Sequence, residues 1–430
     1  MQAPLVAALP HSPTHRVQHG IAALSVTVLL LFAMLLVVAV TNRNVVVEMR
    51  ASASQYRSTQ AFEAAEAGLE WALAKLNDDA TLGDDCLPST AAGARSFRDR
   101  VLVDDDALPG FRPATWDDAG TARVQQVACL RAESGWSCSC PSGGAPTLPA
   151  TATMTVAPAF VVAFAPGAKP GIVVASAVGC TQAGASCLDS ASSGHDATAR
   201  LEVAFGLVPG LRSAPAAALT VRGNLDAGTA ALGLQNRDAR SGGMAVHAGG
   251  RIAGSALRLA TPPGSPLDGS LVSNDTQLAG LAVDRLFARW FAMDKAAWSA
   301  QPAVRHLTCL GDCTADLLSA IAAGHRLIAV AGDLGVHGPV VLGSAQRPVV
   351  LVVDGAARLT GNVSLNGLVY AGAIEWQDAS AGAAIDGAAI SEHDYIGNAD
   401  ADIVRDPIVL ERLRSGTGTF ARVSGSWKDF

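Results

Sequence analysis

An uncharged apolar run near the N-terminus constrains this chain more than any other feature. Residues 21–40 contain no charged residue, no glycine and no proline. A helix of about 20 such residues spans the hydrocarbon core of a bilayer, which is roughly 30 Å thick. A single span has to be helical, because in lipid its backbone polar groups can bond only to one another. The sequence therefore predicts one membrane-spanning helix.

The helical pattern continues beyond this run. Apolar side chains recur at spacings of three or four as far as Leu76, with no proline and no cluster of turn residues between them. They are Val46, Met49, Ala53, Tyr56, Phe62, Ala65, Leu69, Ala72 and Leu76. An ordinary signal anchor is usually followed by a linker. Here we expect the same helix to leave the membrane and place this stripe against a globular domain.

The leader and the end of this helix resemble those of type IV pilins. A short leader ends in Gly20, the apolar half follows, and residues 61–69 read Ala-Phe-Glu-Ala-Ala-Glu-Ala-Gly-Leu. With Phe62, Ala65, Glu66, Gly68 and Leu69, this segment resembles the PilX family of minor pilins over about residues 15–78. The resemblance implies cleavage after Gly20 by a prepilin peptidase and N-methylation of Ile21.

The fifth residue of the expected mature chain departs from the major pilins, which carry glutamate there. This chain has Ser25. A carboxylate in lipid is unfavourable unless it is paired, and in the major pilins the resemblance implies a pair with the terminal amine of a neighbouring subunit. A chain without that carboxylate suits a tip or initiating position better than the repeating shaft.

Two plainer interpretations of the N-terminus explain less. A cleaved secretory signal usually has an apolar region of about 7–15 residues, shorter than this run, and is followed by a small-residue cleavage site. A plain signal-anchored envelope protein would not account for residues 62–73.

The composition indicates β structure beyond the helix. Only 16% of the residues are charged and 43 of the 430 are glycine, in a chain long enough for two or three folded units. The net charge of −7 does not indicate nucleic-acid binding by the whole chain, although folding could gather the scattered arginines into a local patch.

We therefore predict an α+β chain in four parts. A leader covers residues 1–20, a transmembrane and assembly helix 21–78, a pilin-like β-sheet head 79–213, and a Gly-rich β domain 214–430. In the head, β-like runs at 97–103, 122–130, 151–165, 171–179 and 197–207 follow one another without helices, which favours an antiparallel sheet. In the last run, Leu201, Val203 and Phe205 should share the buried face.

The sequence pattern changes from about residue 214. Short apolar segments are separated by glycines, and residues 359–363 (Leu-Thr-Gly-Asn-Val) echo residues 221–225 (Val-Arg-Gly-Asn-Leu). This pattern favours the stacked short strands of a β-solenoid over a β-sandwich, because each strand is too short to bury its own face. One helix, at about 278–298 and capped by Asn274 or Asp275, should cover part of this domain. A short helix at 408–413 follows Asp406-Pro407, and residues 418–430 should form a final strand anchored by Trp427.

All eight cysteines follow the membrane span, and an even number in an exported domain favours disulfides. Cys309 with Cys313 and Cys180 with Cys187 are plausible local pairs. Cys86, Cys129, Cys138 and Cys140 would pair among themselves in one of three ways. Zinc is the rival interpretation for Cys138 and Cys140, but one residue between them is too few for the usual ligand spacing.

No catalytic residues, cofactor or firm metal site can be assigned. The common nucleophile, zinc-protease and phosphate-loop motifs are absent from the sequence, and His247, His325, His337 and His393 share no spacing. Asn398, Asp400 and Asp402 resemble the start of a calcium loop, but Ile403 and Val409 occupy the positions that need glycine and glutamate. An acidic surface loop explains them more simply.

The sequence predicts a minor type IV pilin, held in the inner membrane and then carried into a periplasmic and extracellular pilus. Its partners would be other minor and major pilins, the prepilin peptidase, the inner-membrane assembly machinery, and DNA or a cell surface at the tip. The alternatives are a tip pseudopilin of type II secretion and a membrane-anchored β-solenoid carbohydrate-active enzyme.

Overall fold

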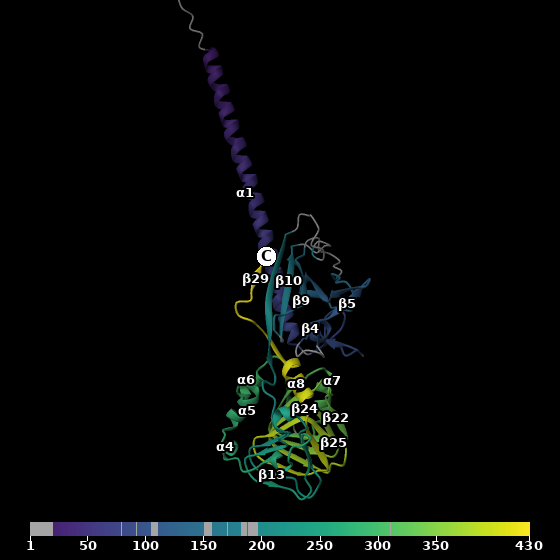
Figure 1. The fold of residues 1–430 in the computed structure, drawn as a ribbon. Helices are drawn as coiled ribbons and strands as arrows, with labels where there is room; N and C mark the ends of the chain where they lie inside the picture. The colour runs from purple at the N-terminus through teal and green to yellow at the C-terminus, as the bar shows by residue number, and fades with distance from the viewer. Residues whose placement is uncertain are drawn as a thin grey trace, which may run out of the picture. The chain divides into compact units, whose positions relative to one another are not determined.

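The computed structural model describes residues 20–78, 80–91, 93–104, 111–149, 157–169, 171–181, 187, 197–309 and 311–430 (Figure 1). The chain divides into two compact units, Met1–Arg57 and Ser58–Phe430. Helix α1 (Gly20–Leu76) begins in the first unit and ends in the second. The second unit is mostly β structure with a few helices, so the α+β prediction is confirmed.

An antiparallel sheet forms the part of the second unit that receives α1. Its strand order is β28-β11-β10-β9-β7-β8, with β29 also paired to β11. The strands are β7 (Gln126–Ala132), β8 (Gly135–Ser139), β9 (Ala159–Pro166), β10 (Ile172–Cys180), β11 (Thr198–Pro209), β28 (Gly418–Arg422) and β29 (Lys428–Asp429). Leu201, Val203 and Phe205 are buried on one face of β11, as their alternation predicts. They pack with Leu69, Ala72 and Leu76 of α1 in one hydrophobic core.

The final strand predicted for residues 418–430 has its partner in this sheet. Phe420 of β28 lies opposite Leu207 of β11, and Lys428 of β29 lies opposite Glu202. The whole C-terminal β region is therefore inserted between two neighbouring strands of one sheet.

One predicted strand, at residues 97–103, is wrong over most of its length. Phe97–Val101 form the helix α2, and only Leu102–Asp104 are extended, as β3. Ser96 accepts a hydrogen bond from the amide of Asp99, and an N-cap of this kind starts a helix despite β-prone residues. Short strands surround it: β1 (Thr81–Leu82), β2 (Arg95–Ser96), β4 (Phe111–Pro113), β5 (Thr115–Asp118) and β6 (Thr121–Val124).

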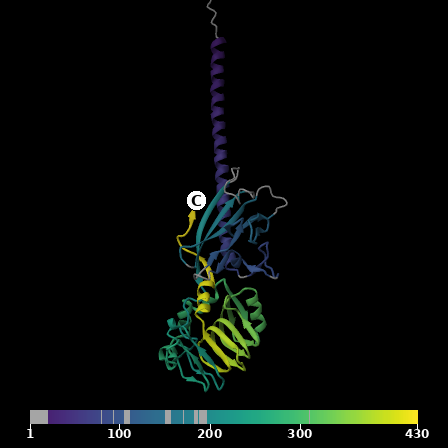
Figure 2. The same ribbon diagram turned by 45° about the vertical axis from the view of Figure 1, so that its right-hand side comes forward.

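The C-terminal β region consists of parallel strands that curl around an apolar interior (Figure 2). Every strand pair of this sheet within the described residues is parallel. The strands before the helical segment are β12 (Leu219–Val221), β13 (Leu225–Asp226), β14 (Gly233–Gln235), β15 (Val246–Ala248), β16 (Ile252–Ala253), β17 (Arg258–Ala260) and β18 (Leu271–Val272). Those after it are β19 (Val304–Thr308), β20 (Leu327–Ala331), β21 (Leu334–His337), β22 (Val340–Leu342), β23 (Val349–Thr360), β24 (Val363–Gln377), β25 (Ala383–Ser391), β26 (Tyr395–Asn398) and β27 (Ala401–Arg405).

Glycines permit the close stacking of these strands at one corner. Gly367 lies opposite Val349 on one side and Gly387 on the other. Both glycines have positive φ, +149° and +141°. A Cβ added to Gly367 would lie 1.9 Å from the carbonyl oxygen of Val349, and one on Gly387 would lie 1.9 Å from that of Gly367. No side chain fits at either position.

The single helix predicted at about 278–298 is instead three short helices. They are α4 (Thr276–Ala279), capped by Asp275, α5 (Val283–Phe291), and α6 (Lys295–Ser299), capped by Asp294. Gly280 ends the first, and Ala292 ends the second in the left-handed conformation. The prediction followed the apolar spacing and overlooked Asp294 as a second N-cap.

These helices cover one outer face of the parallel sheet (Figure 1). Phe287 and Phe291 pack against Tyr370 of β24, with ring centroids 5.0 Å (Phe287) and 5.8 Å (Phe291) from that of Tyr370, and Trp298 packs edge-on against both phenylalanines. Helix α8 (Pro407–Gly416), the short helix predicted after Asp406-Pro407, is capped by Asp406 and adds Leu410 and Leu413 to this cluster. The remaining helical segments are α7 (Thr314–Ala322) and the 3-10 turns η1 (Ala239–Ser241) and η2 (Asp268–Ser270).

The eight cysteines form four disulfides. Cys180–Cys187 and Cys309–Cys313 are the two local pairs that their spacing suggested. Of the three arrangements open for the other four cysteines, the structure has Cys86–Cys140 and Cys129–Cys138. The second of these joins positions directly opposite each other on β7 and β8.

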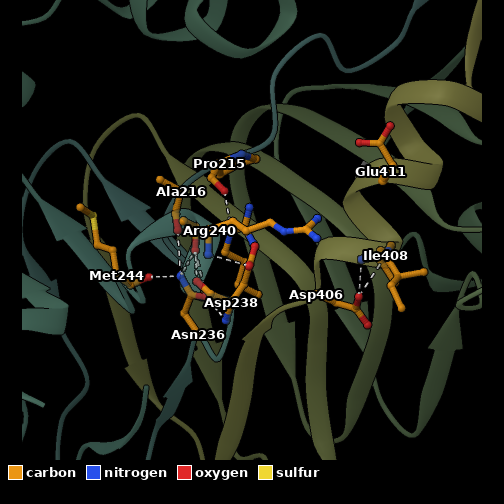
Figure 3. A network of polar contacts seen from close by, with 12 residues as sticks. Pro215, Ala216, Asn236, Asp238, Arg240, Met244, Asp406, Ile408 and Glu411 are labelled. Carbon is orange, nitrogen blue, oxygen red and sulfur yellow. Dashed lines mark hydrogen bonds and ion pairs between the residues drawn. The ribbon is translucent and has the colours of Figure 1, made fainter. Parts of the chain in front are cut away.

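A buried polar network joins the start and the end of the C-terminal β region (Figure 3). Asn236 is fully buried, and its amide nitrogen lies 2.9 Å from the carbonyl oxygen of Ala216 and 2.7 Å from that of Met244. Arg405 donates to the carbonyl oxygen of Pro215 at 2.8 Å and to the carboxylate of Asp238 at 2.6 Å. The side chains of Arg405 and Asp238 are 8% and 14% exposed, so water screens this ion pair little.

We expect Arg405→Met to lower the free energy of unfolding by about 3 kcal/mol. The substitution leaves a buried carboxylate at Asp238 without its partner and the Pro215 carbonyl without its donor. Urea unfolding of the detergent-solubilised chain measures the loss. Arg240→Met in the same network loop is the matched control, because Arg240 is exposed, and its effect should stay within about 0.5 kcal/mol. Equal effects of the two substitutions would contradict this account of the network.

Folding does gather arginines, at the junction between the antiparallel sheet and the C-terminal β region. Arg98, Arg326, Arg347 and Arg412 all line a cavity of about 370 Å³ there. Their guanidinium groups bond to the protein itself: Arg98 to the carbonyl oxygen of Gly418 at 2.8 Å, Arg326 to that of Gly416 at 3.1 Å, Arg412 to that of Ala345 at 2.8 Å, and Arg347 to the carboxylate of Asp99 at 3.0 Å. We infer that this cluster holds the antiparallel sheet and the C-terminal β region together at their junction.

Candidate functional site

The apolar half of α1 carries the expected processing and assembly positions. Gly20, Ile21 and Ser25 all lie within the helix, and the side chains from Ala23 to Thr59 are exposed. Among the described residues, one helical segment, Ala23–Leu76, is long and apolar enough to cross a membrane. Thr27 and Thr41 donate to the carbonyl oxygens of Leu24 and Val37, at 2.9 and 2.7 Å. These hydroxyls are therefore satisfied within the helix, as a lipid environment requires.

The end of α1 sits on the antiparallel sheet through small residues. Ala61, Ala64, Ala65, Gly68 and Leu69 are all buried. A Cβ added to Gly68 would lie 2.9 Å from Cδ2 of Phe160 on β9. The motif therefore has a direct structural explanation, because its alanines and glycine let the helix backbone approach the strands.

The sheet contributes a glycine of its own, which sequence reasoning missed. A Cβ added to Gly179 of β10 would lie 2.1 Å from the carbonyl oxygen of Ala61 and 2.3 Å from the amide nitrogen of Ala65. Helix and strand thus meet backbone to backbone at this position. We call Ala61, Ala64, Ala65, Gly68 and Gly179 the helix seat. A glycine inside an alternating strand was the available signal, since it often marks a close backbone approach.

The other side of the same helix segment is polar and exposed. Glu63, Glu66 and Glu70 all lie on it. Phe62, which the predicted apolar stripe placed toward the core with Ala65 and Leu69, is on this exposed side instead and is 36% exposed. Its ring lies 6.3 Å from that of Trp427, the residue predicted to anchor the C-terminal strand.

The C-terminal segment holds this exposed side of the helix. Asn77 donates to the carbonyl oxygen of Phe420 at 2.9 Å and accepts from its amide at 2.7 Å. Arg422 forms an ion pair with Glu70, and its guanidinium carbon lies 5.9 Å from the ring of Trp427. We call these contacts the C-terminal clasp. Neither Asn77 nor Arg422 could be paired with its partner from sequence, because more than 340 residues separate each pair.

We expect Asn77→Ala to lower the free energy of unfolding by about 2 kcal/mol, because it removes two hydrogen bonds to the backbone of Phe420. Asn77→Asp should have an intermediate effect, since it keeps the acceptor and loses the donor. Thermal unfolding followed by circular dichroism compares them. The control is Glu63→Ala, an exposed position on the same helix, and an equal loss from it would contradict the clasp.

The calcium candidates are engaged by protein donors. The side-chain oxygen of Asn398 accepts from the amides of Thr229 and Ala230 at 3.1 and 3.0 Å. Asp400 accepts from the amide of Ala231 at 2.7 Å, and Asp402 lies 3.0 Å from the guanidinium of Arg258. These oxygens hold adjacent corners of the parallel sheet together. Within the described residues, no group of three or more histidines, cysteines or acidic residues could hold a metal ion.

The comparisons bear chiefly on the N-terminal helix. Residues 19–70 match the family model described as PilX N-terminal. A search of curated proteins found no match. Among solved structures, the competence-associated pilin ComZ from Thermus thermophilus is 14% identical, with 87% of this chain and 97% of that chain covered and a TM-score of 0.20. A TM-score this low carries no structural argument.

The matched range coincides with the helix and motif described above, and it includes Gly20, Ser25 and the α1 residues of the helix seat. It confirms the resemblance drawn from those residues and supports a minor type IV pilin, and the apolar helix fits a membrane-anchored one. The match to the PilX N-terminal family is confined to residues 19–70 of the 430-residue chain.

Proposed function

We propose that this protein is a minor type IV pilin that is cleaved between Gly20 and Ile21 by a prepilin peptidase and N-methylated on Ile21. The main support is the match of residues 19–70 to the PilX N-terminal family. These residues belong to a helix whose first half is apolar and exposed and whose second half packs on a sheet. Its role is assembly rather than catalysis. Apolar helix faces bury against neighbouring pilins as the subunit leaves the lipid with the assembly machinery.

The intact mass of the protein tests the class directly. It is measured in cells with and without prepilin peptidase. Loss of residues 1–20 together with gain of one methyl group, only when the peptidase is present, is the expected result. A chain of full length in both strains would make this a signal-anchored envelope protein and would overturn the proposal.

We further propose that the protein occupies the tip of the pilus. Ser25 provides no carboxylate to pair with a neighbouring subunit in the apolar core of a fibre. We expect Ser25→Glu to raise the share of the protein found along pilus shafts, measured by immunogold labelling of sheared fibres, with Ser25→Ala as the matched control. An unchanged distribution would contradict the positional argument.

A tip pseudopilin of type II secretion is the alternative within the same architecture. Deletion of the gene separates the two, because loss of pili and loss of secreted enzymes are distinct phenotypes. The parallel ladders support classing the C-terminal region as a β-solenoid. A solenoid carbohydrate-active enzyme is the alternative of a different class, and cleavage of a polysaccharide by the purified chain would distinguish it from a pilin.

A further inference from the structure

Two outer faces of the C-terminal β region differ in what they carry. Helices α5, α6 and α8 pack on the face formed by β20, β25 and the first part of β23. A second face is formed by β21, β26 and the later residues of β23 and β24, which pair in register. Helix α7 contacts its edge strand β21, where the amide of His337 donates to Oγ1 of Thr314 at 2.9 Å. We call this second surface the ladder face.

Polar side chains stand in two registered rows on the ladder face. His337, Thr360, Gln377 and Asn398 are paired neighbours on successive strands and form the first row. Arg358 and Glu375 are paired neighbours in the second row, with Ile396 and Asp226 beyond them. Adjacent strands are about 4.8 Å apart, so the rows present groups at regular short intervals across the strands.

Part of the first row has unused hydrogen-bonding capacity. Among the described residues, the side chains of His337, Thr360 and Gln377 make no hydrogen bond, whereas Asn398 is engaged by the corner of β13. His337 and Thr360 also line a cavity of about 660 Å³ with Asp312, Asp333 and Arg358. A row of free donors and acceptors beside a hollow is suited to a ligand rich in hydroxyl groups.

The charge on this face argues against a polyanion. Asp226, Asp312, Asp333 and Glu375 lie on or beside this face, and the guanidinium of Arg358 is itself paired with Asp333 at 2.6 Å and Glu375 at 3.3 Å. The amide of Ala356 and the guanidinium of Arg358 hold the pKa of Asp333 below its ordinary value, so this carboxylate stays ionised at neutral pH. A phosphodiester chain would meet net negative charge here, whereas neutral hydroxyls would not.

We propose that the ladder face binds an uncharged polysaccharide laid across the strands, with His337, Thr360 and Gln377 as its row of hydrogen-bonding contacts. The inference rests on the proposed function to the extent that a displayed pilin needs a surface ligand. It deepens that function by favouring a glycan surface over DNA. Carboxylate and guanidinium groups of the second row would complete the contacts to sugar hydroxyl pairs.

Binding by the detergent-solubilised full-length chain tests the proposal. The neutral probes are hydroxyethyl cellulose, galactomannan and chitohexaose, and the anionic probes are polygalacturonate and double-stranded DNA. We expect at least one neutral probe to bind. His337→Ala/Gln377→Ala should weaken that binding about tenfold, because it removes two hydrogen-bonding side chains. The matched control, His393→Ala/Gln277→Ala, removes the same residue types from exposed positions elsewhere and should leave the affinity unchanged.

Three outcomes would overturn the proposal: no neutral probe binds at millimolar sugar concentration, DNA alone binds in a salt-dependent manner, or both double variants retain full affinity. Circular dichroism of each variant confirms that the fold is intact before binding is compared. Because the purified chain is assayed outside any pilus, failure of glycan binding is distinct from failure of peptidase processing, which the intact-mass measurement reports.

Discussion

Gly179→Ala should detach the end of α1 from the antiparallel sheet and lower the free energy of unfolding by about 3 kcal/mol or more. The added Cβ would lie 2.1 and 2.3 Å from backbone atoms of Ala61 and Ala65, and real Cβ atoms essentially never come within 3.0 Å of another heavy atom. Backbone atoms of the helix cannot rotate away from the added Cβ as the end of a flexible side chain can. The helix therefore has to move away, and the contacts of Leu69, Ala72 and Leu76 weaken with it.

Hydrogen exchange at the amides of residues 61–76 measures this detachment, and two other glycines calibrate it. Gly144→Ala places its Cβ in open space and should change little. Gly68→Ala should fall between them, because the Cβ meets the ring of Phe160 at 2.9 Å while the helix gains about 1 kcal/mol of intrinsic propensity. Unchanged protection in Gly179→Ala would show that the helix does not rest on β10 in this way.

Gly367→Ala should disrupt the stacking of β23, β24 and β25, with a loss of about 4 kcal/mol. Two effects add: the positive φ of +149° disfavours any side chain, and the Cβ would lie 1.9 Å from the carbonyl oxygen of Val349. Gly387→Ala repeats both effects one strand along, against the carbonyl of Gly367, and should match it.

Gly382→Ala separates the two effects. Its φ is +103°, but an added Cβ would meet nothing within 4 Å, so only the backbone strain remains, about 1–2 kcal/mol. Hydrogen exchange at the amides of β24 and β25 reports the loss in each variant. If Gly367→Ala lost no more protection than Gly382→Ala, close stacking at this corner would not be what the glycine provides.

The sequence predicted those features of the fold that depend on local sequence patterns. The apolar run and the Ala61–Leu69 motif predicted the long helix, strict alternation predicted the buried face of β11, and Asp406-Pro407 predicted the start of α8. Local competition explains the errors. Ser96 caps a helix where β-prone residues indicated a strand, and Asp294 starts a new helix where aromatic spacing suggested one continuous element.

Contacts between residues far apart in the chain could not be predicted from the sequence. The apolar stripe includes Phe62, because nothing in the local sequence indicates that Trp427, near the other end of the chain, lies beside it. The motif at residues 61–69 indicates a family resemblance but not a close approach of backbones, and Gly179 as the counterpart depends on the register of β10 against α1. The ladder face likewise depends on which strands become neighbours, and the glycine spacing alone could not decide this.

Because β28 and β29 pair with the antiparallel sheet that contains β11, the edge of that sheet is completed last during synthesis. During synthesis, β11 emerges more than 200 residues before the strands that complete its edge. The clasp on α1 can therefore close only after the ribosome has released the last residues. Any chain that stops early, or whose inserted region has not folded, keeps an open sheet edge and an unfastened helix. If the proposed pilin function holds, entry into a fibre would depend on a finished polypeptide, because an unfinished one lacks both the sheet edge and the clasp.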